Sequence, residues 1–128
     1  MLDPQQELFI RIKTDIEALG FAVYDGVLPP EDTPYPFVYL DGFRQTDEEY
    51  KNAVCGRVFP KIHVWHNNTK QRGTVSEMLL KIKTALRKIE HTANFGWMVR
   101  NIYQDITPDT TTKMPLLHGV IDAEMQFS

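Results

Sequence analysis

The amino-acid sequence predicts an α+β domain in which two helices pack on one face of a mostly antiparallel sheet. The chain has 128 residues, 42% of them hydrophobic, which suffices for one domain with a substantial core and leaves little room for two. Helical and strand-like patterns follow in the order helix, strands, helix, strands, which is typical of helices segregated to one side of an antiparallel sheet. The turn-rich segment 107–115 is suited to joining the last two strands as an antiparallel pair. We therefore expect one domain over residues 1–128.

The first helix is predicted to begin after Asp3 and to stop at Gly20. Asp3 can cap its first turn, Pro4 suits the first helical turn, and Gln6 sits where a capping-box partner would. Hydrophobic residues then recur at helical spacing, namely Leu8, Phe9, Ile12, Ile16 and Leu19.

The second helix is predicted to start at a capping box formed by Thr74 and Glu77, directly after Gly73. Its hydrophobic residues fall within a narrow arc at 3.6 residues per turn. They are Val75, Met78, Leu79, Ile82, Leu86 and Ile89.

Five segments are predicted as strands. They are residues 21–24, 37–40, 53–66, 97–106 and 116–127. In the segment 53–66, Pro60 predicts a sheet edge or a bulge, because proline cannot donate a ladder hydrogen bond. The even positions of this segment, Val54, Val58, Ile62 and Val64, form one apolar face. In the last strand the apolar face consists of Leu117, Ile121, Ala123, Met125 and Phe127.

Two segments between these elements are predicted to be loops. Residues 25–36 contain four prolines and are expected to form a stiff, extended loop. Residues 41–52 are polar and are also expected to lie outside regular structure.

Composition excludes several classes of protein. The net charge of −3, from 14 basic and 17 acidic residues, argues against a generally basic nucleic-acid binder. A single cysteine, Cys55, excludes an internal disulfide and a cysteine-based zinc site. No apolar run approaches the length of a membrane span, and the first residues lack a signal-peptide pattern. We expect a soluble, intracellular domain.

A search for catalytic chemistry gives no positive result. On a regular strand, His63 and His66 point to opposite faces, and His91 and His118 have no acidic or histidine neighbour at ligand spacing. The sequence contains neither a nucleophile elbow nor a phosphate-binding glycine loop. We therefore expect no catalytic residues, no cofactor and no metal site.

The charges are segregated along the chain. Residues 25–49 carry seven acidic side chains and one basic side chain, whereas residues 70–90 carry six basic and two acidic ones. Two ordinary solvated faces would account for this pattern. The sharper interpretation is that an acidic patch on one subunit meets a basic patch on the next, in a head-to-tail contact that can close into a ring.

Two hydrophobic residues lie off the helical stripes and are candidates for subunit contacts. Ile10 is nearly opposite the buried stripe of the first helix, and Leu80 lies well away from that of the second. Single exposed apolar residues are common, so this observation alone does not require an interface. The candidate contact residues are Asp47, Glu48, Glu49, Ile10, Leu80, Lys81, Lys83 and Arg87. A nucleic-acid-binding role for the basic helix is less favoured, because its exposed face has no aromatic residues.

Several segments together resemble the tail-completion proteins of long-tailed bacteriophages and prophages. The resemblance rests on the Thr33-Pro34-Tyr35-Pro36-Phe37-Val38-Tyr39-Leu40 strand start and on Ile62-His63-Val64-Trp65-His66. It extends through the helix at 74–89 to the terminal His118-Gly119-Val120 strand. These are packing and turn signatures, and they span nearly the whole chain.

This resemblance implies a tail terminator, or tail-to-head joining protein, with an α+β fold. Such proteins form a hexameric ring on the tail tube, end its polymerisation and present a surface to the head connector or head-completion protein. The resemblance carries over no cofactor and no catalytic residue. It places the protein at the head–tail junction of the virion, and in the host cytoplasm during assembly. It also implies that the segment at about 41–52 is mobile and orders in the assembly.

The leading hypothesis is a structural assembly protein that forms a ring and contacts the major tail tube protein. DNA passing through such a ring agrees with a net acidic chain, because a basic lumen would retain the duplex. The alternative is a small soluble α+β enzyme or ligand-binding domain with a pocket on the open sheet face near His63, Trp65 and Tyr103.

Overall fold

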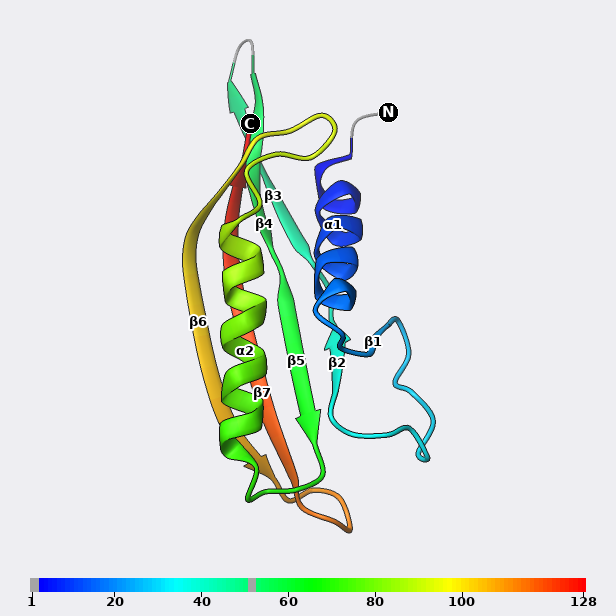
Figure 1. Ribbon diagram of the computed structural model, residues 1–128. Coiled ribbons are helices and arrows are strands. Elements are labelled where there is room, and N and C mark those ends of the chain that lie inside the picture. The colour runs from blue at the N-terminus through cyan, green and yellow to red at the C-terminus, as the bar shows by residue number, and fades with distance from the viewer. Residues whose placement is uncertain (1–2, 51–52) are drawn as a thin grey trace.

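The computed structural model describes residues 3–50 and 53–128, and it confirms the predicted α+β class. Over these residues it contains two helices and one mostly antiparallel sheet of seven strands (Figure 1). The elements are α1 (Pro4–Ala18), β1 (Val23–Asp25), β2 (Phe37–Leu40), β3 (Arg44–Tyr50), β4 (Ala53–Phe59), β5 (Lys61–His66), α2 (Arg72–Arg87), β6 (Trp97–Asp109) and β7 (Leu116–Phe127). Within the described ranges, neither helix is long and apolar enough to cross a membrane.

Strand β7 is the centre of the sheet. It pairs antiparallel with β6 along one side, and with β5 and β4 along the other. Beyond these, β2 pairs with β5 and β3 pairs with β4, while β1 lies parallel to β2 at an edge. The predicted antiparallel pairing of the last two strands is confirmed, although β6 continues to Asp109 and shortens the connection to residues 110–115.

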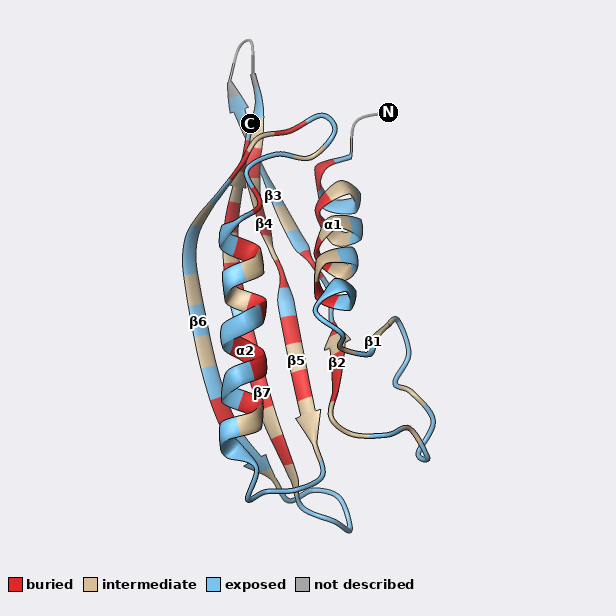
Figure 2. Ribbon diagram, viewed as in Figure 1, coloured by how far each residue is buried: buried red, intermediate tan, exposed pale blue. Residues whose placement is uncertain are grey.

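Both helices cover one face of the sheet, and the core lies between the two layers (Figure 2). The predicted apolar face of β7 is buried, and so are Val58, Ile62 and Val64. The helical stripes predicted for α1 and α2 supply the other half of the core. Leu19, predicted for the α1 stripe, is instead 38% exposed, because the helix ends at Ala18 and Leu19 is its C-cap, and Phe9 is only partly buried. Gly119 allows α2 to pack closely on β7, because a Cβ there would lie 2.8 Å from Val75 Cγ1 and 3.0 Å from Leu79 Cδ1.

The predicted ends of α1 are confirmed. Asp3 is the N-cap, and its Oδ1 accepts a hydrogen bond from the Gln6 backbone N–H at 3.0 Å. Gly20 follows the helix with φ of 94°, a conformation that favours glycine.

The predicted capping box of α2 is wrong. The helix begins at Arg72 with Gln71 as N-cap, three residues before the expected N-cap Thr74. Thr74 therefore lies inside the first turn, where its hydroxyl donates to the side-chain oxygen of Gln71 at 2.9 Å. Glu77 instead forms an ion pair with Lys81.

The predicted strand 53–66 is divided at Pro60 into β4 and β5, and neither part is a sheet edge. Both parts keep the same register against β7, and the Ala123 N–H still donates to the Pro60 carbonyl at 3.0 Å. Pro60 lies where the neighbour on the opposite side changes from β3 to β2. Pro60 therefore interrupts the strand at the point where its neighbouring strand already changes from β3 to β2.

The prediction of a loop at 41–52 is wrong for residues 44–50, which form β3 and pair with β4 from Arg44↔Phe59 to Tyr50↔Ala53. Residues 51–52 lie outside the described part. The sequence hides this strand because polar side chains occupy both of its faces, so no apolar alternation marks it. Val54 of β4, predicted to face the core, is 69% exposed because the hairpin extends past the helices (Figure 1).

We predict that Gly56→Ala destabilises the protein by about 1–3 kcal/mol, the usual cost of overpacking. A Cβ at this position would overlap the backbone oxygen of Thr46 and lie 2.9 Å from the Phe127 ring. Chemical denaturation measures the change. Gly73→Ala is the matched control, since a Cβ there meets nothing within 4 Å and alanine favours the helix. Equal unfolding midpoints for Gly56→Ala and the parent protein would contradict this account of the hairpin.

Candidate functional site

The predicted contact residues on α2 form a partly exposed, basic face. Leu80 is 57% exposed, Arg87 is exposed and Lys83 is half-buried. Lys81 Nζ lies 3.1 Å from Glu77 Oε1, one helical turn earlier. An exposed pair of this kind contributes little to stability, so Lys81 can exchange its partner at small cost.

Leu80 lies in a groove between the two helices. The groove has a volume of about 470 Å³. From α1 it is lined by Arg11, Asp15, Ala18 and Leu19, and from α2 by Leu80, Lys81, Thr84, Ala85 and Lys88. Its floor is apolar, and three of its four charged residues are basic. It can therefore accept a partner that combines an apolar side chain with carboxylates.

Ile10, which is 54% exposed, lies in an adjoining hollow of about 350 Å³. Arg11 lines both this hollow and the groove, so the structure brings the two off-stripe residues Ile10 and Leu80 onto one helical surface. Arg11 itself is held by Asp15 at 2.8 Å and by the His91 carbonyl at 3.2 Å.

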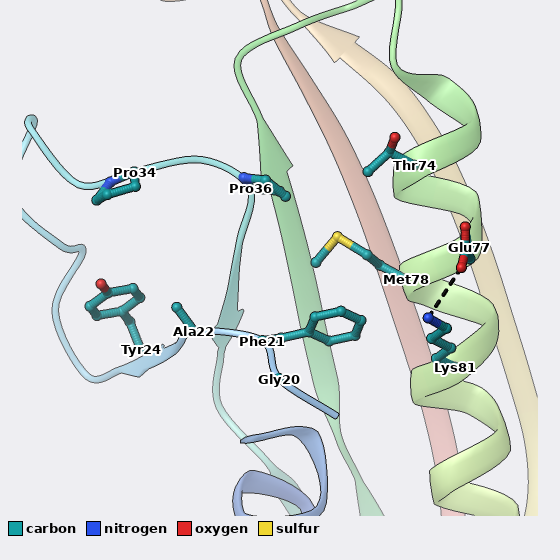
Figure 3. Close-up of a pocket in the computed structure, with 10 residues that line it drawn as sticks. All are labelled: Gly20, Phe21, Ala22, Tyr24, Pro34, Pro36, Thr74, Glu77, Met78 and Lys81. Carbon is teal, nitrogen blue, oxygen red and sulfur yellow. Dashed lines mark ion pairs between the residues drawn. The ribbon is translucent and has the colours of Figure 1, made fainter. Parts of the chain in front are cut away.

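A further hollow of about 470 Å³ lies beside the groove, between the α1–β1 connection, the proline-rich loop and α2 (Figure 3). Phe21 and Met78 converge on it from opposite sides, and the Glu77–Lys81 ion pair lies on the α2 side (Figure 3). Lys81 borders both this hollow and the groove. The hollow and the groove therefore adjoin each other and together form the recessed surface along α2.

The three predicted acidic residues lie on β3, in the hairpin that projects at one end of the molecule (Figure 1). Alternation along the strand separates them: Asp47 and Glu49 share one face and Glu48 is on the other. Glu48 Oε1 lies 3.7 Å from Arg57 Nε, and Arg57 in turn donates to Glu124 at 2.7 Å.

Val54 is the cross-strand partner of Glu49 and therefore lies on the same face as Asp47 and Glu49. This face of the hairpin joins an exposed apolar side chain to two carboxylates. Its chemistry complements that of the helical groove.

The open face of the sheet carries a cluster that sequence reasoning missed. His63 Nδ1 and His118 Nε2 are 2.7 Å apart, and His63 Nε2 lies 3.1 Å from Asp41 Oδ2. The His118 ring stacks on Trp65 with a centroid separation of 4.0 Å. These residues are distant in sequence, and only the β5–β7 register, with Trp65 opposite His118, brings them together.

The cluster shifts two pKa values. Burial lowers the pKa of His118, and the positive potential of His63 lowers it further. The Gly42 N–H and then the His63 side chain lower the pKa of Asp41. His63 thus lies between the Asp41 carboxylate and the His118 ring, within hydrogen-bond distance of both. Over the described residues, no group of three or more His, Cys, Asp or Glu is arranged to hold a metal ion.

The open face also has two shallow hollows, which bear on the alternative hypothesis. Tyr103 lines one of about 360 Å³ with Lys61 and Asp122, whereas Trp65 lines another of about 320 Å³ at the loop end of the sheet. The predicted single pocket near His63, Trp65 and Tyr103 is therefore two separate hollows.

Comparison with known proteins identifies solved structures of similar fold. No protein-family model matches the sequence, and no curated protein matches it. Among solved structures, a chain of the native gene transfer agent (GTA) virion superimposes with a TM-score of 0.63 at 18% identity, over 96% of this chain and 94% of that chain. The bacteriophage SPP1 gp17 protein superimposes with a TM-score of 0.59 at 20% identity, over 97% of this chain and 89% of that chain. The fold is thus shared with proteins of a bacteriophage and of a virion.

We predict that the free energy of unfolding falls as the pH is lowered from about 7.5 to about 5, in part through His118. Its folded-state pKa lies below the unfolded value, so the unfolded chain binds more protons and stability is lost as the pH falls through the unfolded value. His118→Phe keeps a ring against Trp65 and removes the titration, so its stability should depend less on pH. His91→Gln, at an exposed histidine, is the control for the loss of a histidine as such. If the free energy of unfolding of His118→Phe and of the parent protein fell equally with decreasing pH, His118 would not contribute to the pH dependence.

Proposed function

We propose that this chain is a virion assembly protein that caps a phage tail tube, ends its polymerisation and forms the head-docking surface as a ring. The observation that carries the proposal is the fold shared with the GTA virion chain and with SPP1 gp17 over at least nine-tenths of this chain. It agrees with the resemblance of the strand and loop segments to tail-completion proteins.

The surfaces described above are suited to heterologous contacts between copies. The hairpin presents Asp47, Glu49 and Val54 at one end of the molecule, and the groove between α1 and α2 presents Leu80 among basic residues. Because these two surfaces differ from each other, one copy can offer its hairpin to the groove of the next. A repeated contact of this type closes into a ring when the rotation permits.

The proposed partners are a second copy of this chain, the major tail tube protein and a head connector or head-completion protein. A hexamer is the ring size that the family resemblance implies. The resemblance also implies that the hairpin region orders on assembly, which stays a prediction.

We predict that the protein shortens tubes grown from the tail-tube protein of its own phage and forms rings on their ends. Electron microscopy measures tube length, and native mass spectrometry of the protein alone and with tube protein measures the ring. Leu80→Asp should weaken ring formation, because it removes the apolar side chain of the groove and places a negative charge opposite the carboxylates of the hairpin. Val27→Asp makes the same change at a residue that is 80% exposed in the proline-rich loop and should have no effect. A strict monomer in both mixtures, with unchanged tube length, would overturn the proposal.

We predict that Glu49→Lys weakens the contact between copies about fivefold, the factor that corresponds to about 1 kcal/mol for an exposed ion pair. Combining it with Lys88→Glu, which reverses a charge that lines the groove, should restore part of the affinity in the double variant. Native mass spectrometry over a series of salt concentrations measures both effects, and added salt should reduce the difference between the variants. Asp32→Lys changes the same charge outside the hairpin and is the control. Equal losses for Glu49→Lys and Asp32→Lys would exclude the hairpin from the contact.

A further inference from the structure

The hollow beside Trp65 combines aromatic rings with carboxylates. It has a volume of about 320 Å³ and lies between the proline-rich loop, the ends of β2 and β5, and the β6–β7 connection. Tyr35, Phe37 and Trp65 supply its rings, and Glu31 and Asp109 supply its charges. The other residues that line it are uncharged, so the hollow carries negative charge only.

The aromatic wall is held in place by its neighbours. Phe37 and Trp65 are cross-strand partners on β2 and β5, and Tyr35 lies 5.2 Å from Phe37 between ring centroids. His118 stacks on Trp65 within 6° of parallel, which fixes the plane of the indole. The wall is therefore a preformed surface, and little ordering is needed when a ligand binds.

The Asp109 carboxylate stays ionised near neutral pH. Asp109 accepts hydrogen bonds from the Thr111 hydroxyl at 2.6 Å and from the Thr111 N–H at 2.9 Å. These bonds lower the pKa of Asp109. Glu31 is exposed at the rim. An entering group thus meets two negative charges beside aromatic faces.

This combination selects an organic cation. Ring faces attract cations through their quadrupole, and carboxylates add Coulomb attraction and accept hydrogen bonds. A guanidinium fits better than an ammonium because it is planar, stacks on an indole and gives up its hydration more easily. The same chain already makes such a contact, since the Arg44 guanidinium lies 4.1 Å from the centre of the Phe59 ring.

We propose that this hollow receives the side chain of an arginine presented by a partner protein. The proline-rich loop and the β6–β7 connection, which line the hollow, lie at the opposite end of the sheet from the β3–β4 hairpin (Figure 1). A long flexible side chain can reach the aromatic wall of the hollow. This arginine contact is separate from the hairpin and from the helical groove, and it does not depend on whether the chain caps a tail tube.

The test uses the peptide acetyl-Gly-Arg-Gly-amide and follows the two indole N–H signals by NMR. The Trp65 signal should shift saturably, whereas Trp97, whose indole donates to Thr92 inside the fold, should not. The citrulline peptide has the same shape without the charge and should bind much more weakly. Equal shifts with the citrulline peptide would overturn the proposal, and so would tighter binding of tetramethylammonium than of the arginine peptide.

Substitutions locate the site without disturbing the core. Glu31→Gln should weaken binding of the arginine peptide about threefold to fivefold, as expected for the loss of one exposed charge. Asp122→Asn removes a carboxylate from the neighbouring hollow near Tyr103 and is the matched control. Trp65→Leu should abolish binding, which titration calorimetry measures in this variant because the Trp65 indole signal is lost, and its circular dichroism spectrum shows whether the fold is kept. Unchanged affinity in Glu31→Gln, or an equal loss in Asp122→Asn, would place the arginine elsewhere.

Discussion

The packing of α2 on the inner face of β7 is the contact on which the rest of the structure depends. Strand β7 supplies hydrogen-bond partners to β4, β5 and β6, so any change in its position moves most of the sheet. Gly119 lets Val75 and Leu79 lie directly on its backbone. Larger apolar residues, Leu117 and Ile121, flank Gly119 on the same face of β7. Burial of this apolar face under the helices provides most of the favourable free energy of folding.

This arrangement leaves the two faces of the molecule with different chemistry. The helices cover the inner face of the sheet, and their own outer surfaces form the grooves around Leu80 and Ile10. The open face carries polar and aromatic side chains that need no cover, among them the stacked Trp65 and His118. A protein that contacts several different partners benefits from such separation, because each surface can be occupied without competing with the others.

Local signals predicted much of the fold because their physical causes are local. The Asp3 cap and the apolar stripe define α1 within a few turns of chain, and alternation defines β7 within one strand. Strand β3 escaped prediction because it gains its stability from pairing with β4 while both of its faces remain polar. The start of α2 was misplaced because Gln71 ends the preceding turn without a conventional capping side chain.

The sequence by itself determined the fold class, the buried stripe of α2 and most of that of α1, the antiparallel pairing of the last two strands and the exposure of Ile10 and Leu80. Each of these follows from the periodicity of neighbouring residues, from the turn residues between two strands or from the order of the elements, all of which are local features of the chain. Only the tertiary structure decided that His63 meets His118, that Val54 joins the acidic hairpin face, and that Glu31, Trp65 and Asp109 line one hollow. Those contacts join residues far apart in the chain, and they depend on strand register and loop position, which are fixed only when the whole sheet has formed.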